Sequence, residues 1–356
     1  MTTDQDQTEA LQARLRQAHA DSSPVAIHGG GSKAFYGRPI NADPLEISGH
    51  RGIIDHEPGE LVLTARAGTP LGEIRQRLAD HDQMLPFEPP AFGPQATFGG
   101  TIATALAGPR RPYAGAVRDA VLGVRMLNGR GEVLRFGGQV MKNVAGYDLS
   151  RLMAGAQGTL GVLLDISVKV LPQPAFTLTV IQAASASRAL ESLQEWGLRP
   201  LPLSAACHVD DTLHIRLCGA RQGVEQAAEL VGGEVMEGAD DFWHGIREQT
   251  HPFYHVDAPL WRVSVPPGTP MTGFPDACLV DWGGGLRWFY SDAPASDIRA
   301  LAEARSGHAT LFRGHAGGHM ESFHPLPAPM LTLHRRLKEA FDPRGILNPG
   351  RLYPEL

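Results

Sequence analysis

The segment His28-Gly29-Gly30-Gly31-Ser32-Lys33 is the first of three glycine-centred segments in this chain. The other two are Thr97-Phe98-Gly99-Gly100-Thr101 and Gly158-Thr159-Leu160-Gly161. Glycine permits backbone conformations that are closed to other residues, and it lets main-chain N–H groups approach a ligand without an intervening side chain. One glycine run is most often a turn. Three in this order favour backbone cradles for an anionic ligand.

The first glycine segment must be distinguished from a dinucleotide fingerprint. The run from Gly29 to Ala34 satisfies G-x-G-x-x-[GA] and follows the apolar run Val25-Ala26-Ile27. That fingerprint requires a helix that opens at the loop, so that a pyrophosphate meets its N-terminus. Here the chain continues into Phe35-Tyr36-Gly37-Arg38-Pro39, whose glycine and proline oppose a long helix. We therefore predict a nest of backbone amides, with Ser32 as a hydroxyl donor and Lys33 or Arg38 as nearby positive charge.

The length and composition are those of an ordinary soluble enzyme. A chain of 356 residues with 42% hydrophobic content has room for two domains, each with its own core. The formal net charge of −6 argues against a nucleic-acid partner, because phosphate binding needs a basic surface. No apolar run reaches membrane length, and residues 1–6 lack the features of a signal peptide. We expect a cytoplasmic protein with no membrane span of its own.

The three cysteines are Cys207, Cys218 and Cys278, and none forms a C-x-x-C pair. This spacing excludes a disulfide framework and a four-thiolate cluster within the chain. If the protein is a redox protein, its own electron carrier must be organic. Any iron–sulfur centre must belong to a partner.

Hydrophobic periodicity in residues 1–173 predicts alternating strands and helices, followed by a β-hairpin. In the strand over 162–170, apolar residues share one face while Asp165, Ser167 and Lys169 share the other, which predicts a half-buried strand. Pro172 and Pro174 mark the expected end of this domain. The other predicted elements are helices over 8–20 and 148–154, a helix that begins at Pro70 and has Leu71, Ile74 and Leu78 on one face, and strands over 24–27, 61–65, 121–127 and 132–136.

Residues 174–328 predict a second domain of two ferredoxin-like halves that share one antiparallel sheet, with helices on a single side. Residues 329–356 are expected to form a helix that ends at Asp342-Pro343 and a tail that returns to the first domain. The predicted strands of the second domain cover 176–183, 205–209, 212–217, 261–265, 278–282, 286–290 and 309–313, and its helices cover 187–196, 221–230, 240–249 and 295–305.

At these residues the chain resembles the flavoprotein family with the vanillyl-alcohol-oxidase, or PCMH-type, FAD-binding domain. Within that family it is most similar to the FAD-binding E subunits of bacterial glycolate oxidases. The similarity covers residues 24–172 well and the second domain weakly, and it returns at 341–351. The matching features are the three glycine segments, the run Lys142-Asn143-Val144-Ala145-Gly146-Tyr147-Asp148-Leu149, and the terminal Phe341-Asp342-Pro343 with Asn348-Pro349-Gly350.

The resemblance implies an α+β fold, with a two-part PCMH-type FAD-binding domain and a ferredoxin-like cap domain that has an antiparallel sheet. A pyrophosphate without a metal partner needs many converging backbone donors, and the glycine segments can supply them. Family members with covalent flavin carry a histidine where this chain has Ser32, so we expect noncovalent FAD. The resemblance implies cofactor binding by Gly29, Gly30, Gly31, Ser32, Pro89, Thr97, Gly99, Gly100, Thr101, Gly108, Asn143, Tyr147, Gly158, Gly161, Val162 and Asn348.

The resemblance also implies a role in a multi-subunit glycolate oxidase, which converts glycolate, a small 2-hydroxy acid, to glyoxylate. The expected partners are a companion flavoprotein subunit and an iron–sulfur subunit, which could also bring the chain to a membrane. Two alternatives remain open at this point. The chain could be a non-catalytic interaction subunit whose flavin is structural or lost, or a stand-alone FAD-dependent reductase.

The catalytic residues cannot be assigned from the sequence. Metal-dependent members of the family carry a motif of the type H-x-G-D-G-N-x-H, which is missing here. His315 and His319 lie in a glycine-rich loop, so their spacing fixes no common face, and we predict no metal site. This favours a flavin relay or companion subunit. His244, His251 and His255, with the same two loop histidines, remain candidates for a general base.

Overall fold

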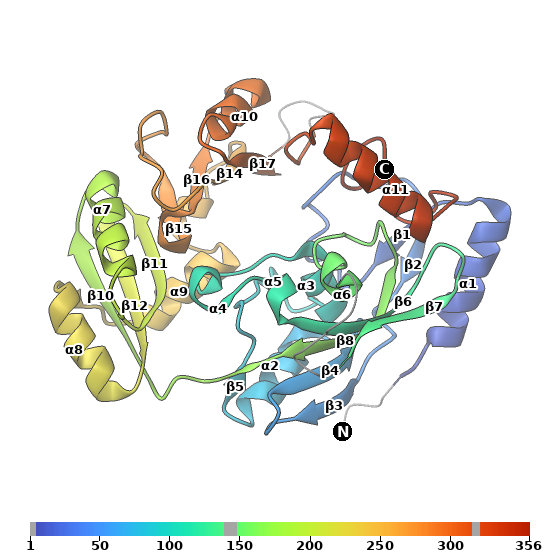
Figure 1. Cartoon of the computed structure of the whole chain (residues 1–356), viewed down its shortest axis with the longest axis horizontal. Coiled ribbons are helices and arrows are strands. Elements are labelled where there is room, and N and C mark those ends of the chain that lie inside the picture. The colour runs from blue at the N-terminus through green and yellow to red at the C-terminus, as the bar shows by residue number, and fades with distance from the viewer. Residues whose placement is uncertain (1–4, 139–147, 315–320) are drawn as a thin grey trace. The chain divides into compact units, whose positions relative to one another are not determined.

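The computed structural model describes residues 5–138, 148–314 and 321–356. The chain forms two compact units (Figure 1). Unit 1 consists of Met1–Leu106, Ala116–Gln173 and Pro325–Leu356, and unit 2 consists of Ala107–Gly115 and Pro174–His324. Three separate stretches of sequence therefore build unit 1.

Unit 1 is built around a five-stranded antiparallel sheet in the order β3-β4-β8-β6-β7. The predicted hairpin is present, with Val124 opposite Phe136 across β6 and β7. The strands are β3 (Ile53–Glu57), β4 (Val62–Arg66), β6 (Val121–Leu127), β7 (Val133–Gly137) and β8 (Val162–Lys169).

The central strand β8 is buried on both faces, whereas its sequence pattern predicted burial on only one. Leu163 and Ser167 are buried on the face that was expected to meet solvent, and Asp165 is only partly exposed. Arg66 on β4 and Arg125 on β6 are the cross-strand neighbours of Asp165, and both form ion pairs with it. This face of β8 is therefore largely buried, and its Asp165 forms ion pairs with arginines of the neighbouring strands where the sequence pattern predicted contact with solvent.

Two small sheets and six helices complete the described part of unit 1. Leu71, Ile74 and Leu78 are fully buried on one face of α2, as the periodicity predicted. The chain after β1 forms turns and bends over 29–37 and opens no helix, which confirms the exclusion of a dinucleotide fingerprint. The elements are β1 (Val25–His28), parallel to β2 (Asp43–Glu46), β5 (Gln83–Met84) with β9 (Leu171–Pro172), and α1 (Thr8–Asp21), α2 (Leu71–Ala79), α3 (Phe98–Thr104), α5 (Val117–Ala120), α6 (Leu149–Leu152) and α11 (Ala328–Phe341).

The C-terminal tail is fixed to β1 and to the third glycine segment. The Val25 amide donates to the Ile346 carbonyl, and the Asn348 amide donates to the Val25 carbonyl. At the end of α11, buried Lys338 forms a 2.9 Å ion pair with Asp342 and also donates to the carbonyls of Thr159 and Leu347. The last residues of the chain thus become part of the structure around the first and third glycine segments.

Unit 2 contains an eight-stranded antiparallel sheet made of two ferredoxin-like halves, as predicted. The first half has the order β13-β10-β12-β11, and the second has the order β15-β16-β14-β17. The halves join where β11 pairs with β15 at His208 and Val280. The strands are β10 (Phe176–Ala183), β11 (Leu203–Val209), β12 (Thr212–Gly219), β13 (Glu234–Val235), β14 (Leu260–Ser264), β15 (Leu279–Asp281), β16 (Leu286–Tyr290) and β17 (His308–Arg313).

Three helices of unit 2 cover one face of this sheet, but a fourth lies on the other face. α7 (Ala186–Gly197) and α8 (Arg221–Val231) pack with Ile215 and its neighbours, and α10 (Ala295–Glu303) packs in the second half. α9 (Ala239–Glu248) was expected on the same side. Its Trp243 instead donates to Thr179, which alternates with the core residue Val180 on β10. Because alternate residues of a strand face opposite ways, α9 covers the opposite face.

Candidate functional site

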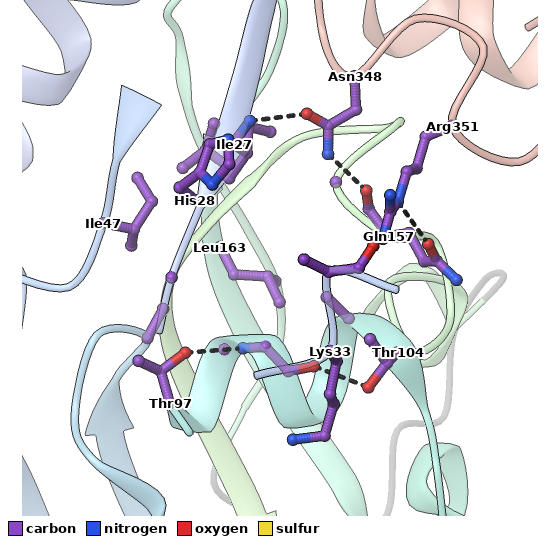
Figure 2. Close-up of a pocket in the computed structure, with 18 of the residues that line it drawn as sticks. Ile27, His28, Lys33, Ile47, Thr97, Thr104, Gln157, Leu163, Asn348 and Arg351 are labelled. Carbon is purple, nitrogen blue, oxygen red and sulfur yellow. Dashed lines mark hydrogen bonds between the residues drawn. The ribbon is translucent and has the colours of Figure 1, made fainter. Parts of the chain in front are cut away.

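A pocket of about 310 Å³ lies within unit 1, and all three glycine segments line it (Figure 2). The loop after β1, the N-terminal part of α3, the turn before β8 and the C-terminal tail supply its walls. The predicted site residues that line it are Gly29, Gly30, Gly31, Ser32, Thr97, Gly99, Gly100, Gly158, Gly161, Val162 and Asn348.

Other predicted site residues lie elsewhere or outside the described part of the chain. Pro89 is buried and its carbonyl accepts a hydrogen bond from Arg75. The Thr101 hydroxyl donates to the Thr97 carbonyl at 2.9 Å, within α3 and its cap. Gly108 belongs to unit 2, where its carbonyl accepts from the Trp282 indole. Asn143 and Tyr147 fall outside the described residues.

The glycines of the first segment serve different purposes. A Cβ at Gly30 would lie 1.5 Å from the backbone oxygen of Gln95, which precedes the second segment. A side chain at this position would therefore force the backbone of one of the two segments to move. A Cβ at Gly29 would lie 2.6 Å from Thr97 Oγ1. Gly31 has a φ of +72°, and its Cβ position has no neighbour within 4 Å. Two of these glycines allow close packing, and the third allows a left-handed turn beside open space.

The second segment forms the start of α3. Thr97 caps this helix, its Oγ1 accepting from the Gly100 amide at 3.2 Å. The Gly99 amide donates to the Ala67 carbonyl at 2.7 Å, and a Cβ at Gly99 would lie 2.7 Å from that of Ala67. Glycine is therefore required here for the close approach of α3 to the end of β4.

The third segment is held by contacts to β6 and to the tail. A Cβ at Gly161 would lie 1.9 Å from the Met126 terminal carbon. Gly158 has a φ of +74°, and its Cβ would lie 2.6 Å from Asn348 Nδ2. Both glycines make room for side chains that come from distant parts of the sequence.

Of the two cations proposed from the sequence, Lys33 lines the pocket and Arg38 does not. Buried Lys33 lines the pocket, with its Nζ 3.4 Å from Ser32 Oγ and 3.2 Å from the Ala91 carbonyl. Arg38 does not line it, and its backbone amide and carbonyl both bond to Arg351. Of the two cations that the sequence left open, only Lys33 is therefore placed next to the proposed nest.

Two residues of the pocket wall, Gln157 and Arg351, were missed from the sequence. Arg351 Nε donates to Gln157 Oε1 at 3.0 Å, and its guanidinium also donates to the carbonyls of Arg38 and Tyr36. Burial lowers the pKa of Arg351. The signal was their position, because Gln157 directly precedes Gly158, and Arg351 directly follows the Asn348-Pro349-Gly350 motif.

Aliphatic side chains also line the pocket. Ile27, Ile40, Ile47, Met153 and Leu163 contribute to its lining. The pocket therefore combines a glycine-rich polar wall, free of side chains at Gly31, with an aliphatic wall. This combination fits a ligand that carries both an anionic group and a flat apolar ring system.

The candidate general bases that the structure describes do not line this pocket. His244 and His255 are exposed in unit 2, and the His251 ring accepts a hydrogen bond from the Phe253 amide at 3.2 Å. Burial lowers the pKa of His251. His315 and His319 lie outside the described residues. Within the described ranges, no group of three or more His, Cys, Asp or Glu side chains is placed to hold a metal ion.

Comparison with known proteins identifies the family. Residues 5–137 match the FAD binding domain family, and residues 326–352 match the C-terminal domain of FAD-linked oxidases. The chain is 50% identical over 351 residues to the glycolate oxidase subunit GlcE of Escherichia coli (strain K12), and the alignment covers 99% of each chain. The chain belongs to the GlcE family. This confirms the resemblance that was drawn from the glycine segments and the tail.

A second relative supports the same family, and a solved structure supports the same fold. The glycolate oxidase subunit GlcD of Bacillus subtilis (strain 168) is 31% identical over 160 residues, which is 44% of this chain and 34% of that protein. The crystal structure of p-cresol methylhydroxylase superposes with a TM-score of 0.73 at 15% identity, covering 98% of this chain and 87% of the other. The predicted fold class is confirmed, and the FAD-binding domain identifies FAD as the cofactor.

The structure gives one further observation on location. Among the helices of the described residues, none is long and apolar enough to cross a membrane.

Proposed function

We propose that the chain is the FAD-carrying subunit of a multi-subunit oxidase that converts glycolate to glyoxylate. The full-length similarity to GlcE carries this proposal, together with a pocket built from all three glycine segments. Oxidation of glycolate removes a hydride, which carries both electrons, from the α-carbon and a proton from the hydroxyl group. FAD bound to this chain would take up the two electrons and let them leave one at a time.

The residues of the pocket fit FAD by chemistry and by shape. The backbone amides of Gly29 to Ser32, the Ser32 hydroxyl and the Lys33 ammonium are the groups that would hold the pyrophosphate. The aliphatic wall of Ile40, Ile47 and Leu163 would exclude water from the ring system. Because Ser32 stands in the position of the covalent histidine, acid or denaturant should release the flavin intact.

Within the complex, this chain acts as a flavin relay, and a companion flavoprotein oxidises the substrate. The chain's sequence lacks the H-x-G-D-G-N-x-H motif of metal-dependent relatives, and its described candidate bases lie in unit 2 outside the pocket. An iron–sulfur subunit would accept the electrons, since the cysteine spacing of this chain cannot hold a cluster.

Co-expression tests this division of labour. The tagged chain should purify with bound FAD but reduce an artificial dye with glycolate only when the companion flavoprotein and iron–sulfur subunits are present. Glycolate oxidation by the chain alone would overturn the relay role. A flavin-free chain that still assembles would favour an interaction subunit, and NADPH oxidation by the chain alone would favour a stand-alone reductase.

A further inference from the structure

Two non-glycine residues of the pocket wall, Gln157 and Asn348, have left-handed backbones. Their φ angles are 47° and 42°. Such conformations cost free energy for most residues and persist only where the surrounding structure fixes them, although asparagine tolerates them better than most. Both side chains are buried, and both residues line the pocket. The pair therefore marks a point where the fold maintains an unfavourable geometry beside the cofactor site.

Asn348 uses both ends of its carboxamide at this point (Figure 2). Its Oδ1 accepts a hydrogen bond from the Ile27 amide at 2.7 Å, and its Nδ2 donates to the Gln157 carbonyl at 2.7 Å. Its own backbone amide donates to the Val25 carbonyl at 3.0 Å. One side chain thus links the end of β1 to the turn that precedes Gly158.

These two partners lead directly into the glycine segments. Ile27 is followed by His28 and the first segment, and Gln157 is followed by Gly158 and the third. Gly158 approaches Asn348 Nδ2 so closely that a Cβ would lie 2.6 Å from it. The distance between the two segments across the pocket is therefore set in part by one carboxamide.

Arg351 makes a second connection of the same kind. It joins Gln157 Oε1 to the carbonyls of Tyr36 and Arg38, which follow the first segment. This connection uses a side chain of Gln157, whereas Asn348 fixes its backbone. The two connections together hold Gln157 from both sides.

We propose that Asn348 is a positioning residue of the FAD pocket, whose carboxamide sets the spacing of the first and third glycine segments. It acts on the cofactor through Ile27 and Gln157, and this role rests on the proposed FAD site. The resemblance had implied direct cofactor binding by Asn348. Its two polar side-chain atoms instead bond to the protein backbone, one as acceptor and the other as donor.

Only a group with one donor and one acceptor in this arrangement satisfies both partners. Aspartate has the same shape and keeps the acceptor for Ile27, but an ionised carboxylate places an oxygen against the Gln157 carbonyl. A protonated carboxyl group regains a donor. Glycine suits the left-handed φ but removes both hydrogen bonds. Aspartate therefore tests the loss of the hydrogen-bond donor, and glycine tests the loss of both side-chain hydrogen bonds in a residue that still suits the left-handed φ.

The test measures FAD affinity by titrating the flavin-free chain with FAD and monitoring flavin fluorescence. Wild type, N348D and N348G are each measured at pH 8 and at pH 5. Relative to wild type at the same pH, N348D should weaken binding about tenfold or more at pH 8. Most of this loss should disappear at pH 5, because burial against the Gln157 carbonyl raises the pKa of the introduced carboxyl above its usual value of about 3.9. N348G should weaken binding at both pH values. Melting temperatures without FAD report folding separately.

N128D serves as the matched control. Asn128 also makes hydrogen bonds through both ends of its carboxamide, but in the turn between β6 and β7, outside the pocket. N128D should change FAD affinity less than twofold, even where it lowers the melting temperature. If N348D does not fold, the comparison of N348G with wild type still measures the loss of the bonds.

Two results would overturn the positioning role while leaving the FAD site intact. One is wild-type affinity in both Asn348 variants. The other is a loss in N348D that is equal at pH 8 and pH 5, because the donor would then be irrelevant. A wild-type chain without affinity for FAD would instead overturn the proposed function, and the positioning role with it.

Discussion

Unit 1 contains two polar regions that are built from different kinds of interaction. The pocket is held mainly by backbone amides and by the carboxamides of Asn348 and Gln157. The second region, here named the Asp165 network, consists of the charged residues Asp6, Arg66, Arg125 and Asp165 together with His50, whose ring lies beside the two carboxylates. Neutral contacts define a shape, whereas paired charges contribute to stability in a way that depends on pH.

The Asp165 network lies across the three central strands of the five-stranded sheet. Arg66 Nη1 lies 3.0 Å from Asp6 and 3.4 Å from Asp165, and Arg125 contacts both carboxylates. Burial raises the pKa of the Asp165 carboxyl, but hydrogen bonds from His50 and Arg125 and the charges of both arginines outweigh it. The pKa of Asp165 therefore lies below its usual value.

No residue of the Asp165 network lines the pocket, so we expect that the two regions can be perturbed separately. A change in the pocket should alter FAD affinity more than folding, unless it displaces backbone. A change in the Asp165 network should alter folding and acid sensitivity while FAD affinity stays the same. The following predictions use this separation, in order of the expected size of the effect.

The largest effect is expected for Gly30→Ala. The added Cβ would meet the Gln95 carbonyl oxygen at 1.5 Å, so the first segment must move away from the second. FAD affinity should fall more than about 100-fold, because the backbone donors lose their convergence. Fluorescence titration measures this loss. Gly72→Ala in α2, where the Cβ would have no neighbour within 4 Å, is the matched control and should leave affinity unchanged.

Asp165→Asn should have the next largest effect, on folding. It removes one of the two carboxylates that Arg66 and Arg125 share and leaves them only Asp6, and both arginine side chains are largely buried. Removing one partner of a buried ion pair costs about 3–5 kcal/mol, and partial exposure reduces this to roughly 2–3 kcal/mol. Urea unfolding measures it. A tenfold change in FAD affinity with unchanged stability would contradict the separation of the two regions.

The pH dependence of stability should show the same network. The pKa values of Asp6 and Asp165 are lowered in the folded chain, where charges and hydrogen bonds outweigh the opposing effect of burial. Their contribution to stability is therefore complete above the unfolded pKa of about 3.9, and it is lost as pH falls through the lower folded values. Between pH 6 and pH 2.5, the wild-type free energy of unfolding should fall more steeply than that of Asp165→Asn. Equal slopes would show that Asp165 does not contribute.

The smallest effect is expected for the charge beside the pocket. Lys33→Met removes the ammonium next to Ser32 and should weaken FAD binding about five- to tenfold, with a smaller loss at high salt. Arg38→Gln changes a side chain that does not line the pocket and should alter affinity less than twofold. Equal effects of both substitutions would mean that only the long-range charge matters.

The sequence predicted local features well and long-range contacts poorly. Periodicity located β10 at Phe176–Ala183 without error, because neighbouring residues determine which side chains alternate. It could not show that Asp165 faces two arginines, since these come from other strands. The placement of α9 depended in the same way on contacts that only the fold creates.

The pocket shows the same limit. The glycine segments and the tail motif were recognisable as short patterns, and they do line one pocket. The bond between Asn348 and Gln157 joins residues 191 positions apart, so no local pattern could show which atoms Asn348 contacts. Its assignment as a cofactor ligand rested on resemblance, whereas its hydrogen bonds indicate positioning.

The most direct test is a crystal structure of this chain purified with FAD. We predict that the pyrophosphate lies against the backbone amides of Gly29 to Ser32, with the flavin unattached to any side chain and the Asn348 carboxamide still bonded to Ile27 and Gln157. FAD bound elsewhere in the chain, or a pocket that stays empty at saturating FAD, would contradict the assignment of this pocket.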